Sequence, residues 1–137
     1  MGKKFYLLAT TLSVFLFGCT NHAIRGSWEL QEVQIPLTED FNSNINYDYY
    51  QSISITDRSF EVWNSEPRLV ERWSYSINND SLLTLSSGFM YKNFVIKEVS
   101  KKRLVLADEQ TLSGYTLYIF VPYGEKNGSV KYTKHCY

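Results

Sequence analysis

The side chains of this 137-residue chain that are suited to covalent or metal chemistry lie near its two ends. Its two cysteines are Cys19 and Cys136, and its two histidines are His22 and His135. Nucleophilic catalysis by a Ser-His-Asp or Cys-His group needs a histidine base beside the nucleophile. Because the chain between His22 and His135 has no histidine, the sequence predicts no catalytic group of this kind.

Acidic side chains are present within the chain, but their spacing points to no particular reaction. Glu61, Glu66, Glu71 and Asp80 lie in segments with strand and turn patterns, and we interpret them as charges that face solvent. A glycosidase pair stays open at this point, since it depends on separation in space. No glycine-rich phosphate loop of the Gly-x-Gly-x-x-Gly or Walker type occurs. We therefore expect a protein that is not an enzyme and needs no cofactor.

The first residues have the layout of a secretory signal peptide. Lys3 and Lys4 precede an apolar run from Phe5 to Phe17, and Gly18 and Cys19 follow it. As a helix, this run of roughly 13 residues would rise about 20 Å, against a hydrocarbon core of about 30 Å. We therefore expect residues 1–18 to be a cleaved leader rather than a permanent transmembrane helix.

The segment Leu16-Phe17-Gly18-Cys19 resembles the bacterial lipobox, in which an aliphatic residue, a variable residue and a small residue precede the lipidated cysteine. The resemblance implies cleavage before Cys19 and a lipid anchor on Cys19, with residues 19–25 as a short tether. The alternative is an ordinary secretory leader that happens to end near Cys19. This tether lacks the acidic residues that often follow the cysteine in surface-exported lipoproteins of the Bacteroidetes. The implied location is therefore the cell envelope, at the periplasmic face of the outer membrane.

The mature chain would be slightly acidic and long enough for one small domain. Removing Lys3 and Lys4 leaves twelve basic residues against fourteen acidic ones, without a long run of either sign, so no nucleic-acid partner is expected. If Cys19 carries lipid, Cys136 has no disulfide partner. His22, His135 and Cys136 then form an incomplete set for tetrahedral zinc, and we expect no metal site.

The remaining sequence alternates between apolar and polar residues, as half-buried strands do. The clearest case is residues 72–77, where Trp73, Tyr75 and Ile77 share one face. Further strands are predicted over 52–56, 59–62, 82–85, 91–99, 103–107 and 115–121, and the strand pattern starts at Ser27. Asn127 and Gly128 indicate a last hairpin that would pair residues 118–122 with 129–133.

About eight strands joined by short reversals predict an all-β fold, an antiparallel up-and-down β-barrel. Closure into a barrel would remove the unpaired edges of the sheet. The polar stretch from Pro36 to Tyr50 breaks the rhythm and is too long for a turn, so we interpret it as a lid over the barrel mouth or a poorly ordered loop.

The segment Gly26-Ser27-Trp28 looks like the Gly-x-Trp signature of the first lipocalin strand. Together with Trp73-x-Tyr75-x-Ile77, the Leu-rich residues 82–85 and the segment Leu104-Val105-Leu106, it resembles the small lipocalin-like lipoproteins of the Bacteroidetes over residues 26–122. In that fold Trp28 would plug the closed end of the barrel, where its ring nitrogen needs a partner. Residues 115–121 lack the arginine of classical lipocalins, which favours the smaller, helix-free relatives.

Aromatic residues make up 16% of the chain, enough either to fill a small barrel or to line a cup for an apolar ligand. Tyr47, Tyr49 and Tyr50 in the long loop are the best candidates for contact at the mouth. The candidate ligand-binding residues are Tyr47, Tyr49, Tyr50, Trp63, Trp73 and Tyr75.

Two functions remain open for residues 26–137, the predicted barrel domain. The first is a lipid-anchored protein that binds a small apolar or amphipathic molecule without catalysis. The second is a structural or inhibitor module of the envelope, whose barrel is filled and whose loops contact a partner protein. An apolar cavity above ~300 Å³ open at one end would favour the first, and a filled interior would favour the second.

Overall fold

The computed structural model describes residues 20–111 and 114–135, so the predicted leader, Cys19 and Cys136 lie outside the described residues. A short helix α2 (Thr20–Ala23) precedes the strands, and a 3-10 helix η1 (Tyr47–Tyr50) follows the first of them. None of the described helices is long and apolar enough to cross a membrane. The strands are β1 (Gly26–Pro36), β2 (Ser52–Ile55), β3 (Ser59–Trp63), β4 (Leu69–Asn78), β5 (Leu82–Ser87), β6 (Met90–Val99), β7 (Leu104–Thr111), β8 (Gly114–Pro122) and β9 (Lys131–His135).

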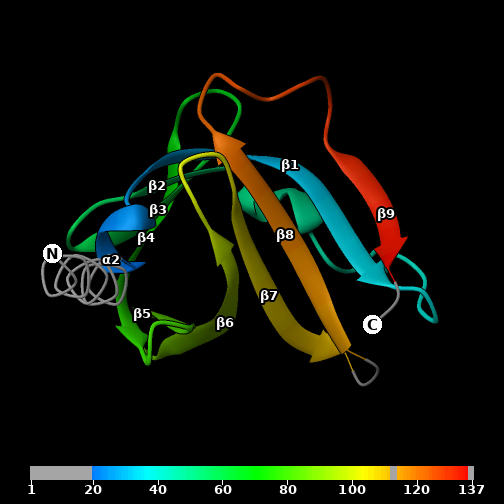
Figure 1. Cartoon of the computed structure of the whole chain (residues 1–137), viewed down its shortest axis with the longest axis horizontal. Helices are drawn as coiled ribbons and strands as arrows, with labels where there is room; N and C mark the ends of the chain where they lie inside the picture. Colours follow the sequence, from blue (N-terminus) through cyan, green and yellow to red (C-terminus); the bar gives the residue numbers. More distant parts are fainter. Residues whose placement is uncertain (1–19, 112–113, 136–137) are drawn as a thin grey trace, which may run out of the picture.

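Strands β1 to β8 form a closed antiparallel barrel (Figure 1), so the all-β, up-and-down architecture predicted from the alternation is confirmed. Each strand from β2 to β7 pairs with both of its neighbours in sequence, and β1 pairs with both β8 and β2 to close the ring. Short reversals join most of the strands, which is why alternation alone was enough to predict the order.

The edge of β1 that does not pair with β8 pairs with two other strands, β2 and β9. Its first part pairs with β2, from Gly26 opposite Ile55 to Glu29 opposite Ser52. Its last part pairs in parallel with β9, from Glu32 opposite Lys131 to Pro36 opposite His135. The predicted hairpin between β8 and β9 is therefore wrong: β7 and β1 already occupy both edges of β8, and the chain crosses over to the edge of β1 that β2 leaves free.

A β-bulge in β1 changes which residues point inward. Trp28 and Leu30 are buried before the register shift between Leu30 and Glu32, and Val33 and Ile35 are buried after it. Because side chains alternate between the two faces of a strand, one extra residue changes the inward-facing side chains from even-numbered to odd-numbered residues. The bulge thus keeps both halves of the strand facing the core.

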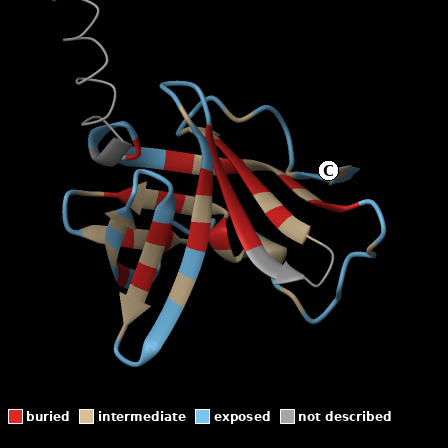
Figure 2. Cartoon of the chain, turned by 60° about the horizontal axis from the view of Figure 1, so that its bottom comes forward, coloured by how far each residue is buried: buried red, intermediate tan, exposed pale blue. Residues whose placement is uncertain are grey.

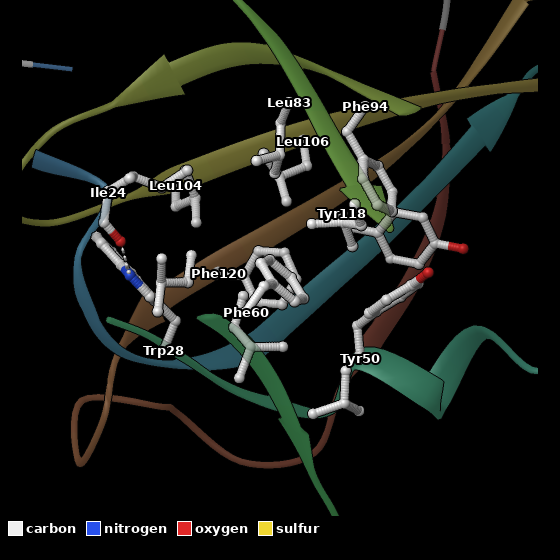
Figure 3. Packing of buried hydrophobic residues seen from close by; sticks show 14 of the residues in the cluster. Ile24, Trp28, Tyr50, Phe60, Leu83, Phe94, Leu104, Leu106, Tyr118 and Phe120 are labelled. Atoms are coloured by element: carbon white, nitrogen blue, oxygen red, sulfur yellow. Dashed lines mark hydrogen bonds between the residues drawn. The ribbon is translucent and has the colours of Figure 1, made fainter. Parts of the chain in front are cut away.

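The interior is filled by apolar and aromatic side chains (Figure 3). The largest of those that are less than 2% exposed are Phe60, Phe94 and Phe120. They pack with buried leucines and isoleucines that include Leu30, Ile53, Ile55, Leu83, Leu85, Leu104 and Leu106. The barrel is thus stabilised by a continuous packed core.

Trp28 closes the end of the barrel at which β1 begins. It is 4% exposed, and its Nε1 donates a 2.9 Å hydrogen bond to the carbonyl of Ile24 (Figure 3). Ile24 lies in the segment expected to be a free tether, yet its side chain is fully buried. The packed domain therefore begins at least two residues before β1.

Candidate functional surfaces at the open end of the barrel

The open end of the barrel is covered by the segment between β1 and β2. Residues 37–46 lead into η1, where the Asn46 side chain accepts the Asp48 backbone N–H and caps the helix. Phe41 packs edge-on against Tyr47 and against Tyr132 of β9, at centroid distances of 5.5 and 5.6 Å. Within the long polar stretch, Phe41 thus packs beside β9, and η1 is the part that packs against the core.

Tyr50 inserts from η1 into the core (Figure 3) and is 8% exposed. Its ring makes T-shaped contacts with Phe94 at 5.4 Å, Tyr118 at 5.5 Å and Phe60 at 6.4 Å between centroids. Burial raises the pKa of its hydroxyl far above the usual value for tyrosine. The lid is therefore held by a side chain that fills the mouth of the barrel.

Next to Tyr50, a second lid residue is bound to the barrel wall. The hydroxyl of Tyr49 donates to the carboxylate of Glu71 on β4. Burial, followed by this hydrogen bond, raises the pKa of Tyr49 to about 12. Glu71 lies on the same face of β4 as Trp73 and is half-buried, so the expectation that it faces solvent is wrong.

The other three aromatic candidates occupy different places. Trp73 is 6% exposed in the core, and its Nε1 has no hydrogen-bond partner among the described residues. Tyr75 lies toward the closed end, where its hydroxyl donates to the carbonyl of Thr56 at 2.5 Å. Trp63 ends β3 and lines a groove outside the barrel. The structure thus brings Tyr47, Tyr49, Tyr50 and Trp73 toward the mouth and separates Tyr75 and Trp63 from it.

A buried ion pair lies on the inner wall near the same end. Lys92 Nζ and Asp108 Oδ2 are 2.6 Å apart, and their side chains are 18% and 6% exposed. Asp108 shares the inward face of β7 with Leu104 and Leu106. Sequence reasoning missed it, because a lone acid at the end of an apolar strand has the appearance of a solvent-facing charge. The pair lies under Phe94, 5.6 Å from Lys92 Nζ to the ring centroid.

The hairpin between β5 and β6 carries apolar residues that the fold leaves exposed. Gly88 has φ +60° in the turn, and Phe89 after it is fully exposed. Met90 is 55% and Tyr91 71% exposed on the first residues of β6. Sequence reasoning missed this tip, although three large apolar residues directly after a glycine turn are a signal of an exposed apolar surface.

Leu69 and Val70, at the start of β4, are exposed at the same end of the barrel. Ser74 of β4 pairs with Ser86 of β5 in antiparallel, so β4 begins at the end of the barrel where β5 finishes. Leu69 is 40% and Val70 50% exposed. We call the five residues Leu69, Val70, Phe89, Met90 and Tyr91 the apolar tip.

Three pockets, of about 450, 600 and 490 Å³, lie outside the barrel wall or at its ends. The one of about 600 Å³ is lined mainly by the segment from His22 to Trp28 at the closed end. Over residues 20–111 and 114–135, no three His, Cys, Asp or Glu side chains are grouped as a metal site would require.

Comparison with known proteins adds one solved structure. No protein-family model matches the chain, and no curated protein matches it. The chain is similar to the crystal structure of an uncharacterized protein from Bacteroides eggerthii, with a TM-score of 0.46 and 18% sequence identity. The similarity covers 72% of this chain and 98% of that one.

Proposed function

We propose that this chain is a lipid-anchored, non-catalytic module of the bacterial cell envelope that binds a partner protein through its apolar tip. The observation that carries the proposal is Phe89, a large apolar side chain left 102% exposed at the end of a hairpin. Single exposed apolar residues are ordinary, but contiguous ones mark interaction sites. Phenylalanine, methionine and tyrosine are also enriched in protein interfaces.

The filled interior favours this function over that of a ligand carrier. Tyr50 occupies the mouth, and Phe60, Phe94 and Phe120 occupy the space below it. A small apolar ligand would have to displace packed aromatic rings, each of which buries a large apolar area. The burial of the candidate residues Tyr50 and Trp73 therefore favours a role in core packing over contact with a ligand.

The position of the tip favours a partner protein over the anchoring membrane. Cys19, the proposed lipid site, precedes α2 at the end where β1 begins, whereas β6 begins at the opposite end. Figure 2 shows the exposed tip of the β5–β6 hairpin at the bottom of the molecule, on the opposite side from α2. A ten-residue strand spans about 30 Å. Lipid on Cys19 would thus point the tip away from the bilayer, toward proteins of the periplasm or the opposing envelope layer.

The segment Ser86–Tyr91 contains no charged residue, which defines the chemistry of the partner. We infer an apolar groove or pocket that receives the Phe89 ring, with polar groups at its rim. Burial of one such side chain contributes about 1.5–3 kcal/mol. That contribution corresponds to about 10- to 100-fold in affinity.

Site-specific photo-crosslinking in the native envelope tests this proposal. A photoreactive phenylalanine analogue at position 89 should give one discrete protein adduct, which the additional substitution Tyr91→Ser removes. The same analogue at Leu37, which is 57% exposed outside the tip, is the matched control and should not give that adduct. Crosslinks to lipid alone, or the same adducts from both positions, would contradict a protein partner at the tip.

A further inference from the structure

A groove on the outside of the barrel has the composition of a sugar-binding site. It borders the apolar tip, because Trp63 in its lining pairs with Leu69. It has a volume of about 450 Å³, within the range of small-molecule sites of about 300–1,000 Å³. Its floor is the outer face of β1 and β2, and the turns 64–67 and 123–126 line its sides. We propose that this groove binds a ring of a neutral oligosaccharide.

Small side chains create the depth of the groove. On the floor, Ser27 of β1 pairs with Ser54 of β2, and Glu29 pairs with Ser52. Ser52 in turn pairs with Trp63 of β3, so a carboxylate, a hydroxyl and an indole ring form one row across three strands. Such a row offers hydrogen-bonding groups beside an aromatic surface.

The lining turns are held in place by hydrogen bonds. The Asn64 side-chain oxygen accepts the backbone N–H groups of Glu66 and Arg68, each at 3.0 Å. On the other turn, the Tyr123 N–H donates to the Ser27 carbonyl at 3.0 Å, and the Gly124 N–H donates to the Glu29 carboxylate at 2.8 Å. A preformed site loses little conformational entropy on binding, which favours affinity for a small ligand.

The lining chemistry selects a neutral, hydroxyl-rich ligand. Trp63 and Tyr123 supply aromatic rings, whose negative faces attract polarised C–H groups such as those on a sugar ring. Serine hydroxyls and the amides of Gln51 and Asn64 supply donors and acceptors for ligand hydroxyls. A fully apolar ligand would bury these groups without partners, at a cost in free energy.

The balance of charge argues against ionic ligands. Glu29 and Lys126 are the one acid and the one base among the lining residues, so neither an anionic nor a cationic ligand gains a net attraction. Phosphate-bearing ligands are typically held by several basic groups or by a row of backbone N–H groups. The groove therefore fits neutral saccharides better than nucleotides or acidic polysaccharides.

Titration of the full chain in detergent with chitohexaose, cellohexaose, maltohexaose and mannohexaose tests the proposal. At least one should bind with a millimolar or tighter dissociation constant and shift the NMR signal of the Trp63 indole N–H. The indole signals of Trp28 and Trp73 are internal controls, because both rings are buried in the core and should not move.

Variants distinguish the groove from nonspecific binding. Trp63→Ala should weaken binding at least tenfold, and Ser54→Phe, which places a ring on the groove floor, should do the same by an independent route. Leu37→Ala is the matched control, since it removes an exposed apolar side chain outside both the groove and the apolar tip. The proposal is overturned if none of the four oligosaccharides binds, if both groove variants bind like the parent, or if hexagalacturonate binds more tightly than every neutral probe.

Discussion

The indole nitrogen of Trp28 donates a 2.9 Å hydrogen bond to the carbonyl of Ile24, and this bond joins the closed end of the barrel to the segment that follows Cys19. Ile24 is fully buried beside it. A lipid on Cys19 would thus be connected to a packed part of the domain through α2 rather than through a long flexible linker. If Cys19 carries the proposed lipid, this short connection would orient the apolar tip away from the bilayer.

The anchor itself is tested by the substitution Cys19→Ser. We expect a full-length precursor without lipid that no longer partitions with membranes, because several acyl chains hold a lipoprotein far more firmly than one. Mass spectrometry of the purified chain and membrane fractionation measure both effects. A Cys19→Ser chain that is still processed and still partitions with membranes would show that the lipobox interpretation is wrong.

The lid is expected to contribute to stability through Tyr50. Tyr50→Ala should lower the free energy of unfolding by about 3–5 kcal/mol, as for other buried aromatic residues cut to alanine. Tyr50→Phe keeps the T-shaped contacts and should change it by less than about 1 kcal/mol. Denaturant unfolding of both variants checks this, with Leu37→Ala as an exposed control. A small loss for Tyr50→Ala would mean that the mouth is not filled in solution.

The buried ion pair should be costly to break from one side. Lys92→Met removes the lysine partner of the buried Asp108 carboxylate, and we expect a loss of about 3 kcal/mol in the free energy of unfolding. Arg103→Met is the matched control, because its partner Glu98 is 47% exposed and such surface pairs contribute about 0–1 kcal/mol. Equal effects of the two substitutions would place the Lys92 pair in a solvated environment.

Stability should fall in alkaline solution as two tyrosines that donate hydrogen bonds to carboxylates ionise. Burial and hydrogen bonding to a carboxylate raise the pKa values of Tyr49 and Tyr132 to about 12, above the usual tyrosine value of 10.0. Because the folded pKa lies above the unfolded one, these groups contribute stability that is complete below pH 10 and is lost as the pH rises toward 12. Unfolding midpoints across this range, compared between the parent and Tyr49→Phe, measure the contribution. An identical pH dependence in both would exclude Tyr49 as a cause.

Much of the barrel is predictable from the sequence, because alternation directly reports which face of a strand is buried. The alternation of Trp73, Tyr75 and Ile77 also places Glu71 on the inner face of β4. The sequence does not show that the hydroxyl of Tyr49 donates a hydrogen bond to the Glu71 carboxylate and so offsets the cost of its partial burial. The partner of β9 was not predictable. It depends on which sheet edge remains free after the barrel closes, and that is a property of the whole fold.

The candidate site was predictable in part for a similar reason. The tyrosine cluster in the long loop predicts contact residues at the barrel mouth, but whether Tyr50 lines a cavity or fills it depends on the volume left by Phe60, Phe94 and Tyr118. Phe89 was not recognised, since alternation reports burial within strands and gives no information about a side chain in a turn.

The affinity of the crosslinked partner for chains with and without the Phe89 ring tests the central claim most directly. With both proteins purified, Phe89→Ser should raise the dissociation constant by about 10- to 100-fold. Its free energy of unfolding should change by less than about 0.5 kcal/mol, because the ring contributes little to the core. Leu37→Ser should leave both quantities unchanged. An unchanged dissociation constant for Phe89→Ser would contradict the assignment of the apolar tip as the binding surface.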